Sequence, residues 1–263
     1  MDVLIDKREL MKKSRERRLN LGMMEKDYVL GWVLYGISKF FPNLVFKGGT
    51  ALSKIYFPKI WRLSEDLDFT IIKENFTGIT RKSEDMLEFV EKKSGIQLKL
   101  KSQYQNPVYL QLKIQYVNVL EFKNWLKIDV TKDVVVQTEM KEVPRLYSDY
   151  PKFMIKTESL NEILASKLRT LIERKKSRDY FDVWLLLKNH EFDFKEVKKI
   201  FVEKCRFKGI KFKTMKQVFP DGIEETLNPY WERELKRLSS FVPELERLLD
   251  EIKRELKFLN LRR

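Results

Sequence analysis

The feature that most constrains this chain is a pair of aspartates, Asp66 and Asp68, separated by one apolar residue in the segment 64–69. The stretch 67–72 is apolar enough to predict a buried strand, and side chains in a strand alternate between its two faces. Asp66 and Asp68 are therefore expected to share one face. Two carboxylates this close repel each other unless a cation lies between them, and Mg²⁺ is the usual cation. The pattern predicts a metal site, and its alternative is a surface acid pair near a turn.

A glycine corner precedes the aspartates by about the length of a helix. The segment 47–50 (Lys-Gly-Gly-Thr) follows a short apolar strand at 44–46 and opens a predicted helix over 51–56. The unpaired N–H groups and the positive dipole of a helix start accommodate a triphosphate. Gly48 and Gly49 let the backbone approach an anion without a Cβ in the way. The spacing matches neither a Walker loop nor a dinucleotide fingerprint, so a purely structural turn is the alternative.

A third acid, Asp129, lies in another apolar strand predicted over 125–130, where an unpaired carboxylate would be costly. If this strand neighbours the strand of Asp66 and Asp68, three carboxylates converge. Such a set can hold two Mg²⁺ ions, one orienting a triphosphate and one activating an attacking hydroxyl. Asp129 is then a candidate general base or metal ligand. The alternative is a solvent-facing strand aspartate.

The net charge of +14 indicates a polyanionic partner, and nucleic acid is the default one. A lysine-rich surface kept soluble by its charge is the alternative. Nine basic residues cluster in one segment: Lys195, Lys198, Lys199, Lys204, Arg206, Lys208, Lys211, Lys213 and Lys216. The interleaved Phe201, Phe207 and Phe212 fit a core better than base-stacking platforms.

Cysteine content and hydropathy bear on the compartment. The chain has one cysteine, Cys205, so it forms no internal disulfide and suits a reducing cytoplasm. No stretch approaches the roughly 18 apolar residues of a membrane span. The N-terminus lacks the apolar core of a secretory signal. We therefore expect a cytoplasmic protein with no membrane partner.

The periodicity of the chain predicts an α+β fold. A mixed, largely antiparallel sheet with helices is expected over 1–150, and an all-helical domain over 151–263. The predicted elements of the first part are helices over 23–40 and 80–94 and a hairpin of strands over 97–104 and 108–116. After a turn-rich bridge at 144–151, a capping box from Ser159 to Glu162 opens the helical part, with later helices over 180–189, 195–205 and 229–257.

A basic set follows the capping box. On one continuous helix, Lys167, Arg174 and Arg178 are 7 and 11 residues apart and lie within about 20° of one face. They could clamp phosphates from across a cleft. If Ser177 instead starts a new helix, only Lys167 and Arg174 share a face. A solvated basic stripe is the alternative to a phosphate clamp.

Taken together, these segments resemble the AbiEii/AbiGii family of DNA polymerase β-like nucleotidyltransferases. The core signature is Lys-Gly-Gly-Thr-Ala-Leu at 47–52, followed by Arg62-x-Ser64-x-Asp66-x-Asp68-Phe69. The segment 25–28 (Glu-Lys-Asp-Tyr) resembles the family's N-terminal helix. Its C-terminal motifs resemble Glu162-x-Leu164-Ala165-x-Lys167-Leu168, Arg174 and Arg178-Asp179-x-x-Asp182. The match runs in the right order over about 25–187, with no motif beyond residue 190.

The resemblance implies the nucleotidyltransferase toxin of a toxin–antitoxin or abortive-infection system. Such an enzyme transfers a nucleotide from an NTP to an acceptor hydroxyl and releases pyrophosphate. The resemblance also places Mg²⁺ on Asp66, Asp68 and Asp129. Its nucleotide-binding candidates here are Lys47, Gly48, Gly49, Thr50, Arg62, Ser64, Lys167, Arg174, Arg178, Asp179 and Asp182. Asp179 and Asp182 alternatively serve as an ion-pair partner and a helix-start acid. Many superfamily members have Gly-Ser at Gly49-Thr50, which leaves the hydroxyl contact open.

Three functions follow in order of preference. The first is Mg²⁺-dependent transfer to RNA, with the tRNA 3′ end favoured because some family members use it and because the charge suits RNA. The second is a catalytically silent nucleic-acid-binding or antitoxin-binding module on the same fold. The third is transfer of a nucleoside monophosphate to a protein hydroxyl. A cognate antitoxin is a candidate partner, and the NTP used is open.

Overall fold

The computed structural model describes residues 5–72 and 75–259. The chain forms two compact units, one of residues up to 133 with 139–157, the other of 134–138 with residues from 158 onward. Each unit has its own apolar core. Among the described residues, no helix is both long and apolar enough to cross a bilayer. The domain boundary expected near residue 150 stays a prediction.

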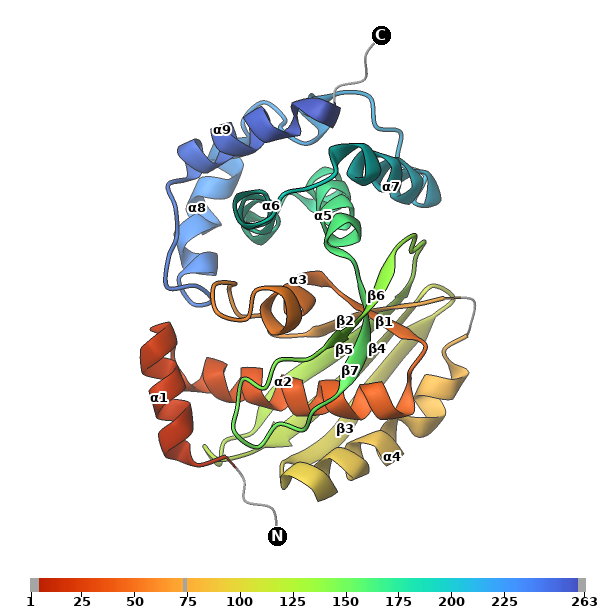
Figure 1. Ribbon diagram of the computed structural model, residues 1–263, viewed down its shortest axis with the longest axis vertical. Coiled ribbons are helices and arrows are strands. Elements are labelled where there is room, and N and C mark those ends of the chain that lie inside the picture. Colours follow the sequence, from red (N-terminus) through yellow and green to blue (C-terminus); the bar gives the residue numbers. More distant parts are fainter. Residues whose placement is uncertain (1–4, 73–74, 260–263) are drawn as a thin grey trace. The chain divides into compact units, whose positions relative to one another are not determined.

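The first unit is built on a mixed sheet, with seven strands in the described part of the chain (Figure 1). The strands are β1 (Leu44–Lys47), β2 (Leu67–Ile71), β3 (Gln97–Asn106), β4 (Tyr109–Val117), β5 (Asn124–Lys132), β6 (Thr138–Glu142) and β7 (Met154–Glu158). Their order across the sheet is β3-β4-β5-β2-β1-β7-β6. β2 pairs antiparallel with β1 and parallel with β5, while β3, β4 and β5 form antiparallel neighbours.

Helices cover one face of this sheet and leave the other face polar. The helical segments of the first unit are α1 (Lys7–Arg17), α2 (Leu21–Phe40), α3 (Gly48–Ala51), the π-helical η1 (Leu52–Tyr56) and α4 (Thr77–Ser94). α2 and α4 lie across the sheet (Figure 1). In β4, Leu110 to Tyr116 are buried at every second position, and the residues between them are half-buried. We call the face opposite α2 and α4 the polar face.

A buried ion pair ties the segment after the glycine corner to α2. The ammonium of Lys54 in η1 lies 2.8 Å from Oδ1 of Asp27, and both side chains are almost fully buried. The Tyr147 hydroxyl donates to Oδ2 of Asp27 at 2.9 Å. Burial lowers the pKa of Lys54, and the charge of Asp27 opposes that shift. The position of the glycine corner therefore depends on a charge pair that water does not reach.

The second unit is helical. Its described helices are α5 (Leu160–Arg174), α6 (Ser177–Asn189), α7 (Phe194–Phe207), α8 (Ile223–Leu235), α9 (Leu245–Glu255) and the short η2 (Met215–Gln217) and η3 (Leu256–Leu259). α5 begins as predicted, because the Ser159 hydroxyl accepts the N–H of Glu162 at 3.2 Å. A mixed sheet followed by helices confirms the predicted α+β fold.

One helix prediction was wrong, and the structure decides between two alternatives for another. The helix predicted over 229–257 is instead two helices, α8 (Ile223–Leu235) and α9 (Leu245–Glu255), and Pro243 disfavours helical backbone just before α9. Lys167 and Arg178 do not share a continuous helix, because the alternative in which Ser177 starts a new helix is the one observed. Lys175 adopts a left-handed conformation with φ 38°, so α5 ends and α6 begins separately.

Lys54→Met should destabilise the protein by about 3–5 kcal/mol, because it leaves the Asp27 carboxylate buried without its cation. Urea unfolding followed by circular dichroism measures this change. Lys92→Met is the matched control, because Lys92 pairs with Glu88 at 2.7 Å on an exposed helix face. The control should leave the unfolding midpoint unchanged, and equal midpoint losses in the two variants would contradict the role of the buried pair.

Candidate active site

Strand register brings two of the predicted carboxylates side by side on the polar face. Asp68 in β2 pairs with Asp129 in the parallel neighbour β5, and adjacent strands lie about 4.8 Å apart. Asp66 immediately precedes β2, which starts at Leu67. The expectation that the strand of Asp129 neighbours the strand of the aspartate pair is confirmed.

Asp66 lies in a setting that disfavours its charge. Burial raises the pKa of its carboxyl group, and the nearby carboxylate of Asp129 raises it further. Lys26 and Lys127 act in the opposite direction. A bound cation would stabilise the ionised form, as expected where acids gather around a metal.

Asp129 is oriented by two side chains of β4. The Tyr109 hydroxyl donates to Oδ1 of Asp129 at 2.6 Å, and Nε2 of Gln111 donates to the same oxygen at 2.9 Å. The Gln111 amide also donates to the Tyr109 hydroxyl at 2.7 Å. Burial, followed by the contact with Asp129, raises the pKa of Tyr109, so its hydroxyl remains a donor. Sequence reasoning did not find Tyr109 and Gln111, although both alternate onto the face of Asp129.

Close approach explains both glycines of the corner. Gly48 has φ +76°, and a Cβ there would lie 2.9 Å from Oδ2 of Asp68. A Cβ on Gly49 would lie 2.9 Å from Nη2 of Arg62. Arg62 is buried, and its guanidinium donates to the Leu63 carbonyl at 3.1 Å. The predicted residues Gly48, Gly49, Arg62 and Asp68 are thus brought together in one place.

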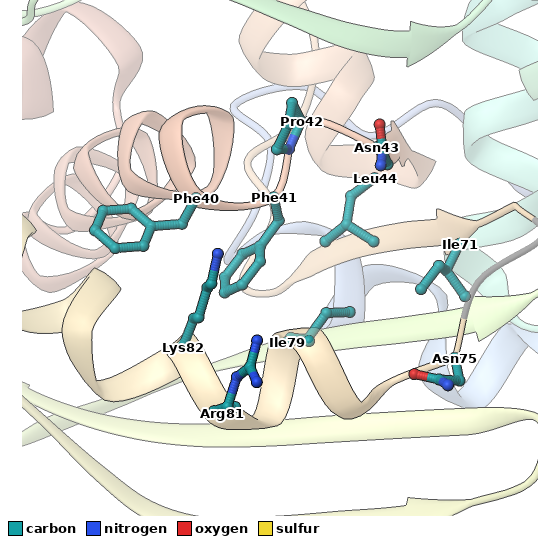
Figure 2. Close-up of a pocket in the computed structure, with 11 residues that line it drawn as sticks. Phe40, Phe41, Pro42, Asn43, Leu44, Ile71, Asn75, Ile79, Arg81 and Lys82 are labelled. Carbon is teal, nitrogen blue, oxygen red and sulfur yellow. The ribbon is translucent and has the colours of Figure 1, made fainter.

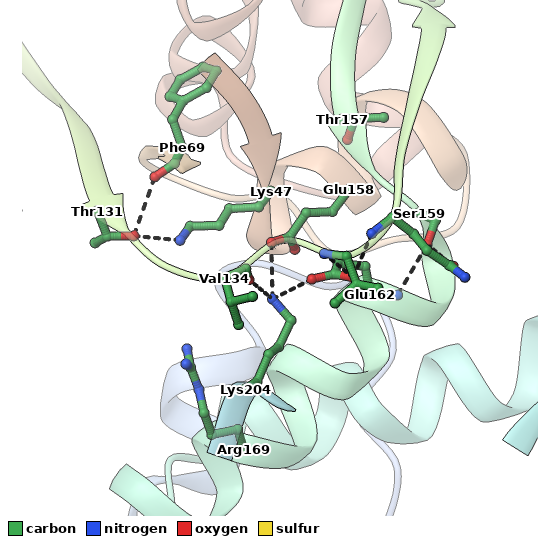
Figure 3. A network of polar contacts seen from close by, with 12 residues as sticks. Lys47, Phe69, Thr131, Val134, Thr157, Glu158, Ser159, Glu162, Arg169 and Lys204 are labelled. Carbon is green, nitrogen blue, oxygen red and sulfur yellow. Dashed lines mark hydrogen bonds and ion pairs between the residues drawn. The ribbon is translucent and has the colours of Figure 1, made fainter. Parts of the chain in front are cut away.

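Hydrogen bonds also connect the glycine corner to the segment that carries Asp66 and to the neighbouring strand β5. The buried Thr50 hydroxyl donates to the backbone carbonyl of Asp66. Lys47 is the register partner of Asp68, and its ammonium donates to the Thr131 hydroxyl at 2.6 Å (Figure 3). Ser64 is half-buried in the segment before β2. Phosphate contacts by Lys47, Thr50 and Ser64 stay predictions. The hydroxyl proton of Thr50 is already used in its hydrogen bond to the Asp66 carbonyl.

The donor set suits a hard divalent cation. Among the described residues, no three side chains of His, Cys, Asp or Glu gather closely enough to form a metal cage. Mg²⁺ does not need such a cage, because it is commonly held by one or two carboxylates together with substrate phosphates and water. Asp66 and Asp68, beside the backbone of the glycine corner, fit that description. Binding of two ions by all three acids stays a prediction.

The predicted residues of the second unit form an ion-pair network. The Lys167 ammonium lies 2.6 Å from Oδ2 of Asp182 and 3.6 Å from Oδ1 of Asp179. Nε and Nη2 of Arg174 donate to the two oxygens of Asp179 at 2.8 and 2.9 Å. Arg178 is half-buried in the first turn of α6. Both aspartates therefore have ion-pair partners, and nucleotide contacts by this network stay predictions.

Comparison with known proteins identifies the family. The sequence matches the family described as "Nucleotidyl transferase AbiEii toxin, Type IV TA system" over residues 32–253, which is most of the chain. The chain belongs to the AbiEii nucleotidyltransferase toxin family. No curated protein matches the sequence.

Solved structures support the AbiEii fold. The nucleotidyltransferase toxin MenT4 from Mycobacterium tuberculosis superposes with a TM-score of 0.75 at 16% identity, covering 97% of this chain and 89% of that one. JHP933 from Helicobacter pylori superposes with a TM-score of 0.50 at 16% identity, covering 91% of this chain and 95% of that one. At these identities the likeness concerns the fold alone.

Lys204, one of the nine basic residues predicted to cluster in this AbiEii chain, is buried. The Lys204 ammonium lies 2.6 Å from Oε1 of Glu162 and 3.5 Å from Oε1 of Glu158, and donates to the Val134 carbonyl at 3.0 Å (Figure 3). The other oxygen of Glu162 accepts the N–H of Gln137 at 3.1 Å. Lys204 therefore holds the segment before β6 and cannot contact a polyanion.

A separate cavity of about 590 Å³ lies at the opposite end of β1 and β2 (Figure 2). It is lined by Leu44 and Ile71, which are register partners, and by Arg81 and Lys82 of α4. Its described lining contains no carboxylate. The cavity is therefore distinct from the carboxylate site.

Gly48→Ala should cost more stability than Gly209→Ala. Both glycines have a positive φ, but a Cβ on Gly209 would meet nothing within 4 Å, whereas one on Gly48 would lie within 3.4 Å of Oδ2, Cβ and Cγ of Asp68. We expect about 1 kcal/mol of backbone strain in each variant, and at least about 1 kcal/mol more for Gly48→Ala because of the clash. Denaturant unfolding of both variants measures the difference, and equal losses would contradict the close approach.

Proposed function

We propose that this AbiEii toxin is a Mg²⁺-dependent nucleotidyltransferase that transfers a nucleotide from an NTP to an acceptor hydroxyl, with the tRNA 3′ end as the favoured acceptor. The observation that supports it most is the register of β2. That register sets Asp68 beside Asp129 and against Gly48. An acid pair beside a phosphate-accommodating corner is what metal-assisted phosphoryl chemistry requires.

The reaction forms a bond between the acceptor oxygen and the α-phosphorus and breaks the bond between the α-phosphorus and the bridging oxygen. Pyrophosphate leaves. The N–H groups from Gly48 to Thr50 bind the triphosphate and hold it in line. Asp129, held by Tyr109 and Gln111, receives the proton of the acceptor hydroxyl or orients that hydroxyl. Asp66 and Asp68 would hold Mg²⁺ together with the phosphates, and Asp129 would add a ligand for a second ion; the bound metal would supply charge neutralisation.

The acceptor and the partner follow from charge and from family. The net charge of +14 favours a polyanion, so RNA suits the acceptor better than a protein hydroxyl. Membership of a type IV toxin–antitoxin family implies a cognate antitoxin. The absence of a membrane-spanning helix among the described residues and the single cysteine fit action in the cytoplasm.

Asp68→Asn should lower transfer by at least about a hundredfold, because it removes a charged ligand and leaves the side-chain volume unchanged. Protein, Mg²⁺, total tRNA and NTPs labelled on the α-phosphate are incubated, and label in RNA is counted. Asp221→Asn is the control, because this Asp side chain is 88% exposed and lies outside the site. The control should transfer at the wild-type rate.

The same assay separates the competing functions. Label in protein instead of RNA would assign transfer to a protein hydroxyl. If no label is transferred to any acceptor while RNA is still retarded on a gel, the chain is a binding module and the proposal is wrong. The intact Asp66, Asp68 and Asp129 argue against a silent module, because a lapsed site has no need to keep three partly buried acids.

Lys167→Met tests whether the second unit binds phosphate. A phosphate clamp predicts a KM for NTP raised by about tenfold, the equivalent of one charged hydrogen bond. If Lys167 is only the ion-pair partner of Asp182, the variant loses stability but keeps the wild-type KM. An unchanged KM would show that the phosphate role of Lys167 is wrong.

A further inference from the structure

The polar face extends from the carboxylates across β5, β4 and β3. Register pairs place Gln111 beside Asp129, Lys113 beside Lys127, and Gln115 beside Trp125. On the next strand, Tyr104 pairs with Gln111. Because side chains alternate, all of these residues point to the side away from α2 and α4. The face is therefore one continuous surface that begins at the acids.

This surface exposes aromatic rings that a solvated sheet does not need. Tyr104 is 58% exposed and Trp125 is 37% exposed. The Lys113 ammonium lies 4.5 Å from the centre of the Trp125 ring, and the rings of Tyr104 and Tyr109 lie 6.2 Å apart. Cation–π and ring contacts hold these side chains in place while their other faces stay open.

Apart from the carboxylates of the candidate active site, this surface carries positive charge. The hairpin from Gln97 to Val117 contains no aspartate or glutamate, and its charged residues are lysines. Lys127 of β5 adds a further exposed cation. Within the described part of the chain, neither Lys99 nor Lys113 has a carboxylate at ion-pair distance. These cations are available to a phosphate backbone.

The chemistry of this surface matches unpaired nucleotides. Aromatic rings on a sheet stack bases, lysines contact phosphates, and amides such as Gln111 and Gln115 hydrogen-bond the edges of splayed bases. Stacking rings spread over a sheet cannot reach the bases of a duplex, which are already stacked on one another. Trp125 lies four residues along β5 from Asp129, or about 13 Å, a span that suits about four stacked bases at about 3.4 Å each.

We propose that the polar face of β3, β4 and β5 is the platform for the unpaired terminal nucleotides of an RNA acceptor. Tyr104 and Trp125 stack the bases, Lys113 and Lys127 contact the phosphates, and the terminal hydroxyl lies beside Asp129. This assignment rests on the proposed nucleotidyl transfer, but the binding it describes is measured without catalysis.

The binding test uses Asp68→Asn protein without NTP, so that no transfer occurs, and a short single-stranded RNA labelled at its 5′ end. Fluorescence anisotropy should show that Tyr104→Ala with Trp125→Ala weakens binding by roughly 10- to 100-fold, because stacking contributes at each base. Tyr104→Phe with Trp125→Phe keeps the rings and should bind within about threefold of the parent. The double phenylalanine variant is also the control for misfolding as the cause of a loss of RNA binding.

Tyr230→Ala is the matched control. Tyr230 of α8 is 48% exposed and carries the Arg233 guanidinium 5.1 Å from its ring centre, so it repeats the aromatic–cation chemistry of Trp125 on a helix that is not part of the polar face. The control should bind RNA like the parent. Unchanged binding in the double alanine variant, or an equal loss in Tyr230→Ala, overturns the platform.

A kinetic measurement separates this proposal from the proposed function. With Asp68 intact, the double alanine variant should raise the KM for RNA by about tenfold or more and leave the KM for NTP unchanged. If wild-type protein transfers no nucleotide, the proposed function fails, and the anisotropy result still decides the platform. If label enters a protein and the double alanine variant lowers that labelling, the face belongs to a protein acceptor and the RNA assignment is overturned.

Discussion

The pairing of β2 with both of its neighbours is the constraint on which the rest of the site depends. The antiparallel register with β1 sets Asp68 against Lys47 and Gly48, and the parallel register with β5 sets it beside Asp129. Leu67, Phe69 and Ile71 are buried on the opposite face. A slip of one residue would turn these apolar side chains outward and Asp68 into the core. The burial of these apolar side chains therefore determines the direction in which the Asp68 carboxylate points.

The glycine corner is held to this frame from two sides. The Thr50 hydroxyl bonds the carbonyl of Asp66, and the buried pair of Lys54 and Asp27 fixes the following turn to α2. Both contacts are shielded from water, so solvent competes weakly with them. The backbone proposed to bind phosphate and the acids are thus in place before a substrate arrives, which is how preorganised electrostatic stabilisation acts.

Local patterns predicted the acids and the corner, because alternation and glycine placement are visible within a few residues. Tyr109 and Gln111 could not be assigned to Asp129 from the sequence, because the register between two strands is a property of the folded sheet. Lys204 was assigned to the surface by its charge and lies in the core of the second unit, where Glu162 compensates it. The sequence left open whether Ser177 starts a new helix, because the left-handed conformation of Lys175 that separates α5 from α6 is rare for a non-glycine residue.

The measurement that tests this account most directly is a crystal structure with Mn²⁺ and a non-hydrolysable NTP analogue, with the metal located by its anomalous scattering. The account predicts Mn²⁺ bound to the carboxylates of Asp66 and Asp68, and a triphosphate contacting the backbone N–H groups from Gly48 to Thr50. A triphosphate bound elsewhere, with neither aspartate contacting a metal, would contradict it.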